Sequence, residues 1–343
     1  MQKGTIAKIN MLKGGLMMWK TRVAILLTMA MFLFAAGCGA SGDKMPEKPV
    51  QPEKIVVQAP VAPPTTPLFK FAADGEIEGM KLELILYKSV EEATTRIAKG
   101  EADFTVLPLN VAAKLYNKQV DISLANVSTW GILYLLTTDS QVADWPDLKG
   151  KELYVGAQGS SPDVLTRYFI SKNGIKEGDI ELAFLNSPEI AQLMINGLVE
   201  NAVLPEPAAT QVLMNNNKVR LARDFFADWQ LFEGQEARLP QAGMVVRNEF
   251  ARLHPSAVTE FQKVYRDAVN WTVANPAEAA PLAAAKMDIA APVFVKSMER
   301  TRLFFATGAE AREDVHTYLS RLLDISPDMV GGKLPDEKFF LAD

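Results

Sequence analysis

The sequence predicts an α/β fold in two lobes, because two runs of alternating strands and helices follow one another along the chain. In the first run, the apolar strand 81–87 is followed by the helix 91–98 and the strand 104–107. The short apolar strand 153–156 begins a second run of the same kind. Strands connected through helices in this way are expected in parallel sheets that carry helices on their faces.

The segment 147–163, DLKGKELYVGAQGSSPD, shows one such unit in detail. A polar turn leads into the strand 153–156, and Gly159 provides the turn that follows. Ser161 before Pro162 is typical of a helix N-terminus, with the serine as cap. Such a unit places unpaired backbone N–H groups at the C-terminal end of a strand, where α/β proteins bind small ligands. An ordinary turn without a ligand is the alternative.

The remaining elements are predicted from the same signals. The first run has strands at 54–57, 81–87, 104–107, 122–126 and 132–137, and helices at 68–73, 91–98 and 111–116. The second run has strands at 153–156, 180–185, 201–204, 219–222 and 243–246, with helices after Ser161, after Ser187 and at 208–214. The segment 224–240 is predicted to be irregular, and the chain to be almost all helical from His254 onward.

Residues 1–37 have the composition of an export signal. They carry five positive charges and no acid, and the apolar run 23–34 precedes the small residues 35–37. A basic region, a short apolar run and small residues before a cleavage site define a secretory signal peptide. A transmembrane helix needs about 20 apolar residues, so a signal peptide is the better interpretation.

Cys38 is the only cysteine of the chain and follows this signal directly. Residues 35–38 resemble a bacterial lipobox, apart from Ala35, where leucine is more common. Cleavage and acylation would make Cys38 a lipid anchor on the periplasmic or cell-surface side of a membrane, whereas a buried or free cysteine is the alternative. Residues 38–53 are polar and rich in proline, and are predicted to be a flexible tether. The initiating residue is Met1, Met17 or Met18.

Charge and motifs argue against nucleic-acid binding and against several enzyme classes. The formal net charge is −5, and it becomes −10 without the five positive charges of residues 1–37, so no basic field attracts nucleic acid. His254 and His316 are the only histidines, which excludes a histidine-rich metal site. No G-x-S-x-G and no phosphate-binding loop occurs, and the G-x-G-x-x-G at 37–42 spans the predicted cleavage site. We therefore predict a binding protein without cofactor, metal or catalytic residues.

Polar side chains recur where predicted strands lead into helices or polar turns. If the two runs face each other, these positions converge on one cleft between the lobes. For each capped helix taken alone, simple stabilisation of the helix is the alternative. The predicted binding residues are Thr65, Thr66, Asn110, Ser128, Thr129, Trp130, Ser160, Ser161 and Glu206.

Three segments match a known family. Residues 98–104, AKGEADF, contain an A-x-G-E-x-D turn; residues 145–151, WPDLKGK, contain a DLKGK domain entry; and residues 197–207, GLVENAVLPEP, approach G-x-V-D-A followed by E-P. With them the chain resembles, from about residue 54 to about 324, the periplasmic solute-binding proteins of ABC importers in the nitrate, sulfonate, taurine and thiamine-precursor group. Asn201 stands where this family often has aspartate, so that position carries no inference.

This resemblance implies a periplasmic-binding-protein fold of type II, which closes on a small ligand by hinge motion. It also implies a monomer that works with ABC permease and ATPase subunits. The predicted first lobe is 54–137 plus 248–343, the second is 148–239, and the crossing segments are 138–147 and 240–247.

The predicted site favours an anion, because helix N-termini and hydroxyl groups suit a sulfonate or nitrate. An unpaired Glu206 carboxylate would repel a plain oxyanion, so a ligand that also carries a donor or cationic group, such as an aminosulfonate or a thiamine precursor, meets both demands. Trp130 and Tyr87 could stack on a ring, with packing in the core as the alternative. An enzyme on the same fold, similar to chorismate dehydratase, and a ligand-sensing lipoprotein are the alternative functions.

Overall fold

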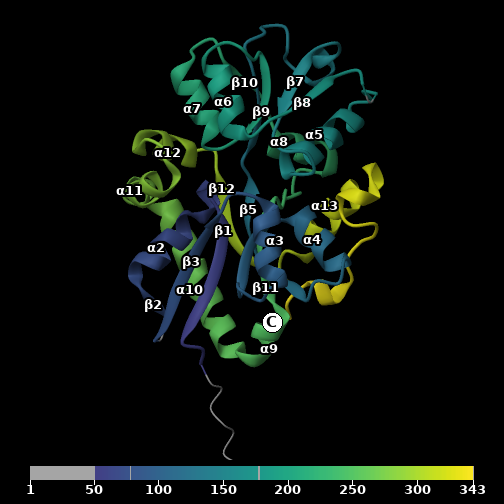
Figure 1. The fold of residues 1–343 in the computed structure, drawn as a ribbon. Coiled ribbons are helices and arrows are strands. Elements are labelled where there is room, and N and C mark those ends of the chain that lie inside the picture. Colours follow the sequence, from purple (N-terminus) through teal and green to yellow (C-terminus); the bar gives the residue numbers. More distant parts are fainter. Residues whose placement is uncertain (1–50, 78, 177, 343) are drawn as a thin grey trace, which may run out of the picture. The chain divides into compact units, whose positions relative to one another are not determined.

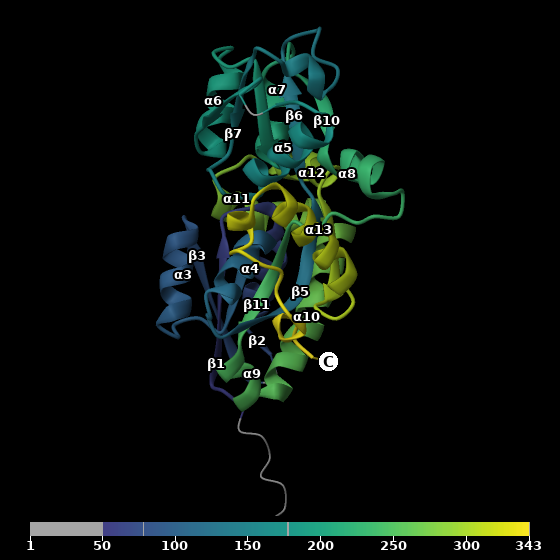
Figure 2. The same cartoon turned by 90° about the vertical axis from the view of Figure 1, so that its right-hand side faces the viewer.

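The computed structural model describes residues 51–342 apart from 78 and 177, and it contains two α/β sheets (Figures 1 and 2). The predicted signal 1–37, Cys38 and all but the last three residues of the predicted tether 38–53 lie outside the described residues. Within the described part of the chain, no helix combines the length and the apolar character needed to cross a membrane.

The larger sheet has seven strands in the order β12-β5-β11-β4-β1-β3-β2. β1 is parallel to β3 and β4, whereas β11 is antiparallel to β4 and β5. The sheet is thus mixed and not parallel as predicted, because β11 enters at the edge where β4 ends and so runs in the opposite direction. The strands are β1 (Lys54–Pro60), β2 (Glu76–Ile77), β3 (Met80–Tyr87), β4 (Phe104–Pro108), β5 (Ile122–Gly131), β11 (Ala242–Arg247) and β12 (Arg302–Thr307).

Helices cover both faces of the larger sheet (Figure 1). On the face of α2 and α10, the ring of Phe104 stacks on Phe261 with centroids 4.1 Å apart. Full burial of such a ring contributes roughly 1.5–3 kcal/mol. Leu107 points to the opposite face, into the core shared with α3 and α4. The helices around this sheet are α2 (Thr66–Asp74), α3 (Val90–Ala98), α4 (Leu109–Asn117), α9 (Asn248–Leu253), α10 (Pro255–Ala274), α11 (Pro276–Met287) and α12 (Ala291–Met298).

The smaller sheet has five strands in the order β10-β6-β9-β7-β8. Trp145 precedes the second strand of this sheet along the chain. Its indole is fully buried, stacks on Phe169 with ring centroids 5.4 Å apart and donates from Nε1 to Asp228 Oδ2 at 2.8 Å. The strands are β6 (Leu133–Thr137), β7 (Glu152–Val155), β8 (Glu181–Phe184), β9 (Asn201–Pro205) and β10 (Arg220–Asp224). The helices packed on them are α5 (Ser161–Lys172), α6 (Ser187–Ile195), α7 (Ala208–Asn215) and α8 (Phe225–Glu233).

The chain passes between the two sheets twice, and both passages precede the predicted crossing segments. β5 and β6 are consecutive strands with only Ile132 between them, yet β6 pairs with β9 in the smaller sheet. The first passage is therefore at Ile132 and not at 138–147. The second lies between α8 and β11, because β11 already belongs to the larger sheet, so the predicted segment 240–247 is mostly strand.

The C-terminal part differs from the prediction of an almost all-helical segment. β12 is an edge strand on β5, with Leu303 and Ala306 buried and Phe304 stacked on Trp130 at 4.3 Å. β12 is a strand because it pairs with β5, and the short apolar run in its sequence does not indicate β5 as its partner. Conversely, α8 forms within a segment predicted to be irregular. The last long helix, α13 (Arg312–Ile325), packs against both α4 and α5.

Candidate functional site

The predicted binding residues lie on the edges where strands of the two sheets end. Thr65 and Thr66 follow β1, Asn110 follows β4, Ser160 and Ser161 follow β7, and Glu206 follows β9. β1 and β4 are parallel, as are β7 and β9, so each set shares one edge of its sheet. Ser128, Thr129 and Trp130 are on β5, directly before the passage at Ile132.

α2 and α5 have their N-caps one residue before the predicted caps and α4 has its N-cap two residues before, and this changes the role of their polar side chains. α2, α4 and α5 have Thr65, Pro108 and Ser160 at the N-cap position, in place of the predicted Thr66, Asn110 and Ser161. None of the three observed caps accepts a hydrogen bond through its side chain. Helix capping, the alternative to ligand binding, therefore does not account for the predicted residues.

Four of the predicted residues have a buried polar atom without a hydrogen-bond partner among the described residues. These atoms are Thr66 Oγ1, Asn110 Oδ1, Thr129 Oγ1 and Ser161 Oγ. Burial of a polar group without a partner costs roughly 1–3 kcal/mol, and such groups are rare enough in folded proteins to need an explanation. A ligand that supplies the missing partners is one explanation.

Gln241 connects Thr129 with the residue before Asn110, although nothing in its local sequence marks it. Its backbone N–H donates to the Thr129 carbonyl at 2.9 Å, and its own carbonyl accepts from Leu109 N at 3.1 Å. Its side-chain Oε1 accepts from Ile132 N at 2.7 Å. The remaining atom, Nε2, is buried without a partner among the described residues. Gln241 thus lies at the junction of β5, α4 and the first passage between the sheets.

The two sheets meet directly beside this junction. Asn110 Nδ2 donates to the Gly159 carbonyl at 2.9 Å, which joins α4 to the loop before α5. Next to that loop, the hydroxyl of Tyr318 on α13 faces Ser161 without a well-formed hydrogen bond, and its oxygen also lacks a partner among the residues that the structure describes. Burial raises the pKa of Tyr318 and the Ser161 hydroxyl opposes this, so Tyr318 stays a protonated donor at neutral pH. We call Asn110, Thr129, Ser161, Gln241 and Tyr318 the buried polar cluster.

The other predicted residues are engaged within the protein. Thr65 Oγ1 donates to the Pro60 carbonyl at 2.5 Å, and Ser128 Oγ accepts from Tyr265 at 3.1 Å. Ser160 Oγ donates to the Ala157 carbonyl. Trp130 has 0% exposure and packs against both Phe304 and Arg238. Tyr87 is buried too, with its hydroxyl on the Val106 carbonyl, so both aromatic side chains are occupied by core packing.

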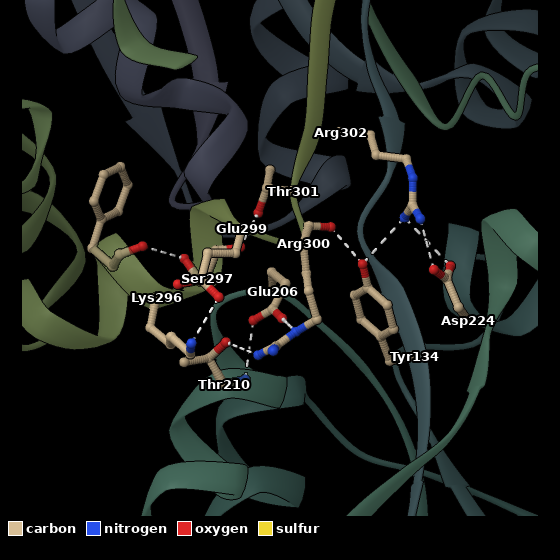
Figure 3. A network of polar contacts seen from close by, with 11 residues as sticks. Tyr134, Glu206, Thr210, Asp224, Lys296, Ser297, Glu299, Arg300, Thr301 and Arg302 are labelled. Atoms are coloured by element: carbon tan, nitrogen blue, oxygen red, sulfur yellow. Dashed lines mark hydrogen bonds and ion pairs between the residues drawn. The ribbon is translucent and has the colours of Figure 1, made fainter. Parts of the chain in front are cut away.

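Glu206 is paired, contrary to the expectation of an unpaired carboxylate. Arg300 Nε donates to Oε1 at 2.7 Å, and Thr210 N donates to Oε2 at 3.0 Å (Figure 3). Arg300 follows α12, next to the larger sheet, whereas Glu206 and Thr210 belong to the smaller one. The repulsion of a plain oxyanion by Glu206 therefore does not arise in this arrangement.

Comparison with known proteins decides the family. The model of the family described as NMT1/THI5 like matches residues 76–279, more than half of the chain. The chain belongs to the NMT1/THI5-like family.

Relatives of this NMT1/THI5-like chain include transport proteins. A Bacillus subtilis (strain 168) protein named for aliphatic sulfonate binding is 26% identical over 267 residues, which cover 75% of this chain and 76% of that protein. An ABC transporter structure from Parabacteroides distasonis has a TM-score of 0.74 at 26% identity, covering 85% of this chain and 99% of the other. The alkanesulfonate-binding protein SsuA of Xanthomonas axonopodis pv. citri, bound to MOPS, has a TM-score of 0.66 at 14% identity, with 85% and 97% covered. The predicted periplasmic-binding-protein fold and the resemblance to ABC-importer binding proteins are confirmed.

A groove of about 1480 Å³ opens beside the contact between Asn110 and Gly159. Its walls come from α3 and α4 on one side and from α5 and the region around β8 on the other. Lys114, Lys118 and Lys176 line it, and within the described part of the chain none of the three forms an ion pair. Of the buried polar cluster only Asn110 reaches this groove, so the groove is a separate, outer part of the same junction.

Proposed function

We propose that this NMT1/THI5-like protein is an extracytoplasmic solute-binding protein that captures a small organic sulfonate between its two lobes and delivers it to an ABC importer. The named relatives support the transport role, and the buried polar cluster supports the position of the ligand. The ligand in this proposal contacts both sheets, so that its binding stabilises the closed arrangement of the lobes.

The observation that carries the choice of ligand is the donor-rich character of the buried polar cluster. Three of its unpartnered atoms are hydroxyl oxygens and one is the amide nitrogen of Gln241, so four can donate a hydrogen bond. Only Asn110 Oδ1 is restricted to accepting. A ligand group rich in acceptor oxygens matches this set, and a sulfonate offers three. The N-terminus of α5 at Ser161 adds a favourable dipole for an anion.

Pairing of Glu206 with Arg300 removes the main reason to require a cationic group on the ligand. The sequence favours an aminosulfonate or a nitrogen heterocycle because a free Glu206 carboxylate would need a hydrogen-bond donor or a cation on the ligand. With that carboxylate neutralised, an alkanesulfonate such as ethanesulfonate is the simplest ligand that the cluster accepts. Nitrate provides the same oxygen acceptors but has no organic part to displace water from the junction between the lobes.

The same proposal includes export and anchoring. The sequence features of residues 1–37 and Cys38 support cleavage and acylation at the cysteine. A lipid anchor and a tether would hold the binding domain near the permease, which raises its local concentration there. The names of the matched proteins refer to transport and binding, which supports this role over catalysis.

Isothermal titration of the full chain, purified in detergent, tests the ligand class. Ethanesulfonate, taurine, nitrate and an aminopyrimidine are titrated separately, each against the same preparation. We expect saturable one-site binding that is tightest for an organic sulfonate. Tight binding of the aminopyrimidine with no heat from either sulfonate would contradict the proposal.

A further inference from the structure

The ion pair of Glu206 with Arg300 joins elements of the two sheets at a buried position (Figure 3). The Glu206 side chain has 0% exposure, and each of its carboxylate oxygens has a donor, Arg300 Nε on one and Thr210 N on the other. A buried carboxylate is tolerated only when it is paired and hydrogen-bonded. Arg300 provides that charge from the segment between α12 and β12.

Arg300 is held in place from both ends. Its guanidinium also donates to Thr210 Oγ1, and its backbone carbonyl accepts from the hydroxyl of Tyr134 on β6. Arg302, two residues further on, has a different partner, since its guanidinium pairs with Asp224 at 2.7 Å. Figure 3 shows the two arginines on separate sides of Tyr134. The pairing with Glu206 is therefore a specific property of Arg300.

The ion pair is next to the buried polar cluster. Glu206 N donates to the Ile132 carbonyl at 2.8 Å, and Ile132 N donates to Gln241 Oε1 at 2.7 Å. Only Ile132 thus separates the backbone of Glu206 from the side chain of Gln241. A net charge on Glu206 or Arg300 would act directly on a ligand bound there, because the field of a buried charge is weakly screened.

We propose that Arg300 is a positioning residue that sets the charge of the ligand which the cleft accepts, by neutralising Glu206. This rests on the proposed capture of a sulfonate at the buried polar cluster. With the pair intact, an anion experiences almost no net charge from this position. Loss of the guanidinium leaves a negative charge beside the ligand, and loss of the carboxylate leaves a positive one.

The proposal makes opposite predictions for the two partners. Two unit charges about 10 Å apart, at an effective dielectric constant of about 20, change a binding constant by roughly tenfold. Arg300→Met is expected to weaken binding of ethanesulfonate by roughly that factor, and Glu206→Gln to tighten it by a similar factor. The double variant, in which both charges are absent, is expected to bind within about threefold of the unchanged protein. Changes in ethanesulfonate affinity that have opposite signs in the single variants and cancel in the double variant indicate an effect of net charge. A double-mutant cycle measures them.

The experiment is isothermal titration of ethanesulfonate into the full-length protein and its variants, with Arg302→Met as the matched control. The control removes a neighbouring arginine from a partly exposed pair and is expected to change affinity by less than threefold. Taurine serves as a second probe, because its ammonium group offsets the sulfonate charge and its shifts should be smaller.

The outcomes separate this proposal from the function on which it rests. If the unchanged protein binds neither sulfonate, the proposed function is wrong, and the proposed role of Arg300 loses its basis. If the protein binds ethanesulfonate but Glu206→Gln weakens binding, the ion pair is only a structural contact, and the proposed role of Arg300 in setting the ligand charge is wrong. Where Arg300→Met does not fold, Glu206→Gln still decides, since glutamine preserves the shape of the side chain and must tighten binding.

Discussion

Replacement of Glu233 by glutamine would remove the charge from a buried junction between α8, α5 and α13. The Glu233 side chain is only 4% exposed. Its oxygens accept from the Tyr168 hydroxyl at 2.5 Å and from Arg321 Nε at 2.8 and 2.9 Å, and Lys172 Nζ lies 3.4 Å away. This junction holds α13, which supplies Tyr318 to the buried polar cluster, against the smaller sheet.

The expected loss is about 2 kcal/mol in the free energy of unfolding at pH 7. Hydrogen bonds to charged groups contribute roughly 1.5–3 kcal/mol, and removal of one partner from a fully buried ion pair costs roughly 3–5 kcal/mol. The expected loss is closer to the range for hydrogen bonds than to the range for buried ion pairs. The reason is that Arg321 and Lys172 are 38% and 37% exposed, so water can solvate them once the Glu233 charge is gone. Glutamine also keeps one acceptor oxygen for the Tyr168 hydroxyl.

The pH dependence follows from the direction of the pKa shift. Burial alone would raise the pKa of Glu233, but hydrogen bonds from Tyr168 and Arg321 outweigh it and lower the pKa below its usual value. A lowered folded-state pKa contributes stability that is present above the unfolded value of about 4.3 and is lost as the pH falls through the folded value. The difference between the unchanged protein and Glu233→Gln should therefore be largest near neutral pH and shrink below about pH 4.

Urea unfolding at several pH values measures this difference, with Glu337→Gln as the matched control. Glu337 pairs with Arg312 of α13 on the surface, with 76% and 46% of the side chains exposed, so its loss should cost well below about 1 kcal/mol. Equal losses for the two variants, or a Glu233→Gln loss that does not change with pH, would show that the buried charge of Glu233 does not stabilise the fold.

Three further changes have distinct expected results. Thr129→Val removes an unpartnered hydroxyl, so unfolding should be unchanged or up to about 1 kcal/mol harder, while ethanesulfonate affinity in titration falls about fivefold; a clear loss of stability would contradict this. Gly243→Ala places a Cβ 2.3 Å from the Asn126 carbonyl oxygen between β11 and β5, and should cost at least about 3 kcal/mol in thermal unfolding; an unchanged melting temperature would argue against this strand pairing. Cys38→Ser should move the protein from the membrane to the soluble fraction in cell fractionation, and continued membrane association would exclude the proposed anchor.

Local sequence signals predicted most of the elements but misplaced their ends. The helix predicted at 91–98 is α3, and its cap Ser89 accepts from Glu92 N at 3.2 Å through its side chain. In contrast, α6 is capped by Asn186, one residue before the predicted Ser187, which is the same shift found at α2 and α5. A serine or threonine before proline marks a helix start to within one residue, because the first residue of a helix is itself defined only to within one or two positions.

The passages between the sheets and the edge strand β12 could not be read from local patterns. β6 is as apolar as a strand of either sheet, and its place in the smaller one depends on pairing with β9, which comes more than sixty residues later. β12 similarly depends on β5. Such pairings are tertiary contacts, and short apolar runs do not specify their partners.

The candidate site was predictable only where it follows the strand ends. Thr66, Asn110, Thr129 and Ser161 were identified from their positions after or on strands. Gln241 and Tyr318 were not, because one lies in an irregular segment and the other inside a C-terminal helix. Arg300 meets Glu206 across 94 residues, and this long-range pair reverses the preference for a cationic ligand that the glutamate alone had suggested.

A structure of the protein with bound ethanesulfonate would show where the ligand lies. We expect the sulfonate oxygens within about 3 Å of the Thr129 and Ser161 hydroxyls and of Gln241 Nε2, between the two sheets. A sulfonate bound only in the outer groove, on Lys114 and Lys118, would contradict the proposed position of the ligand.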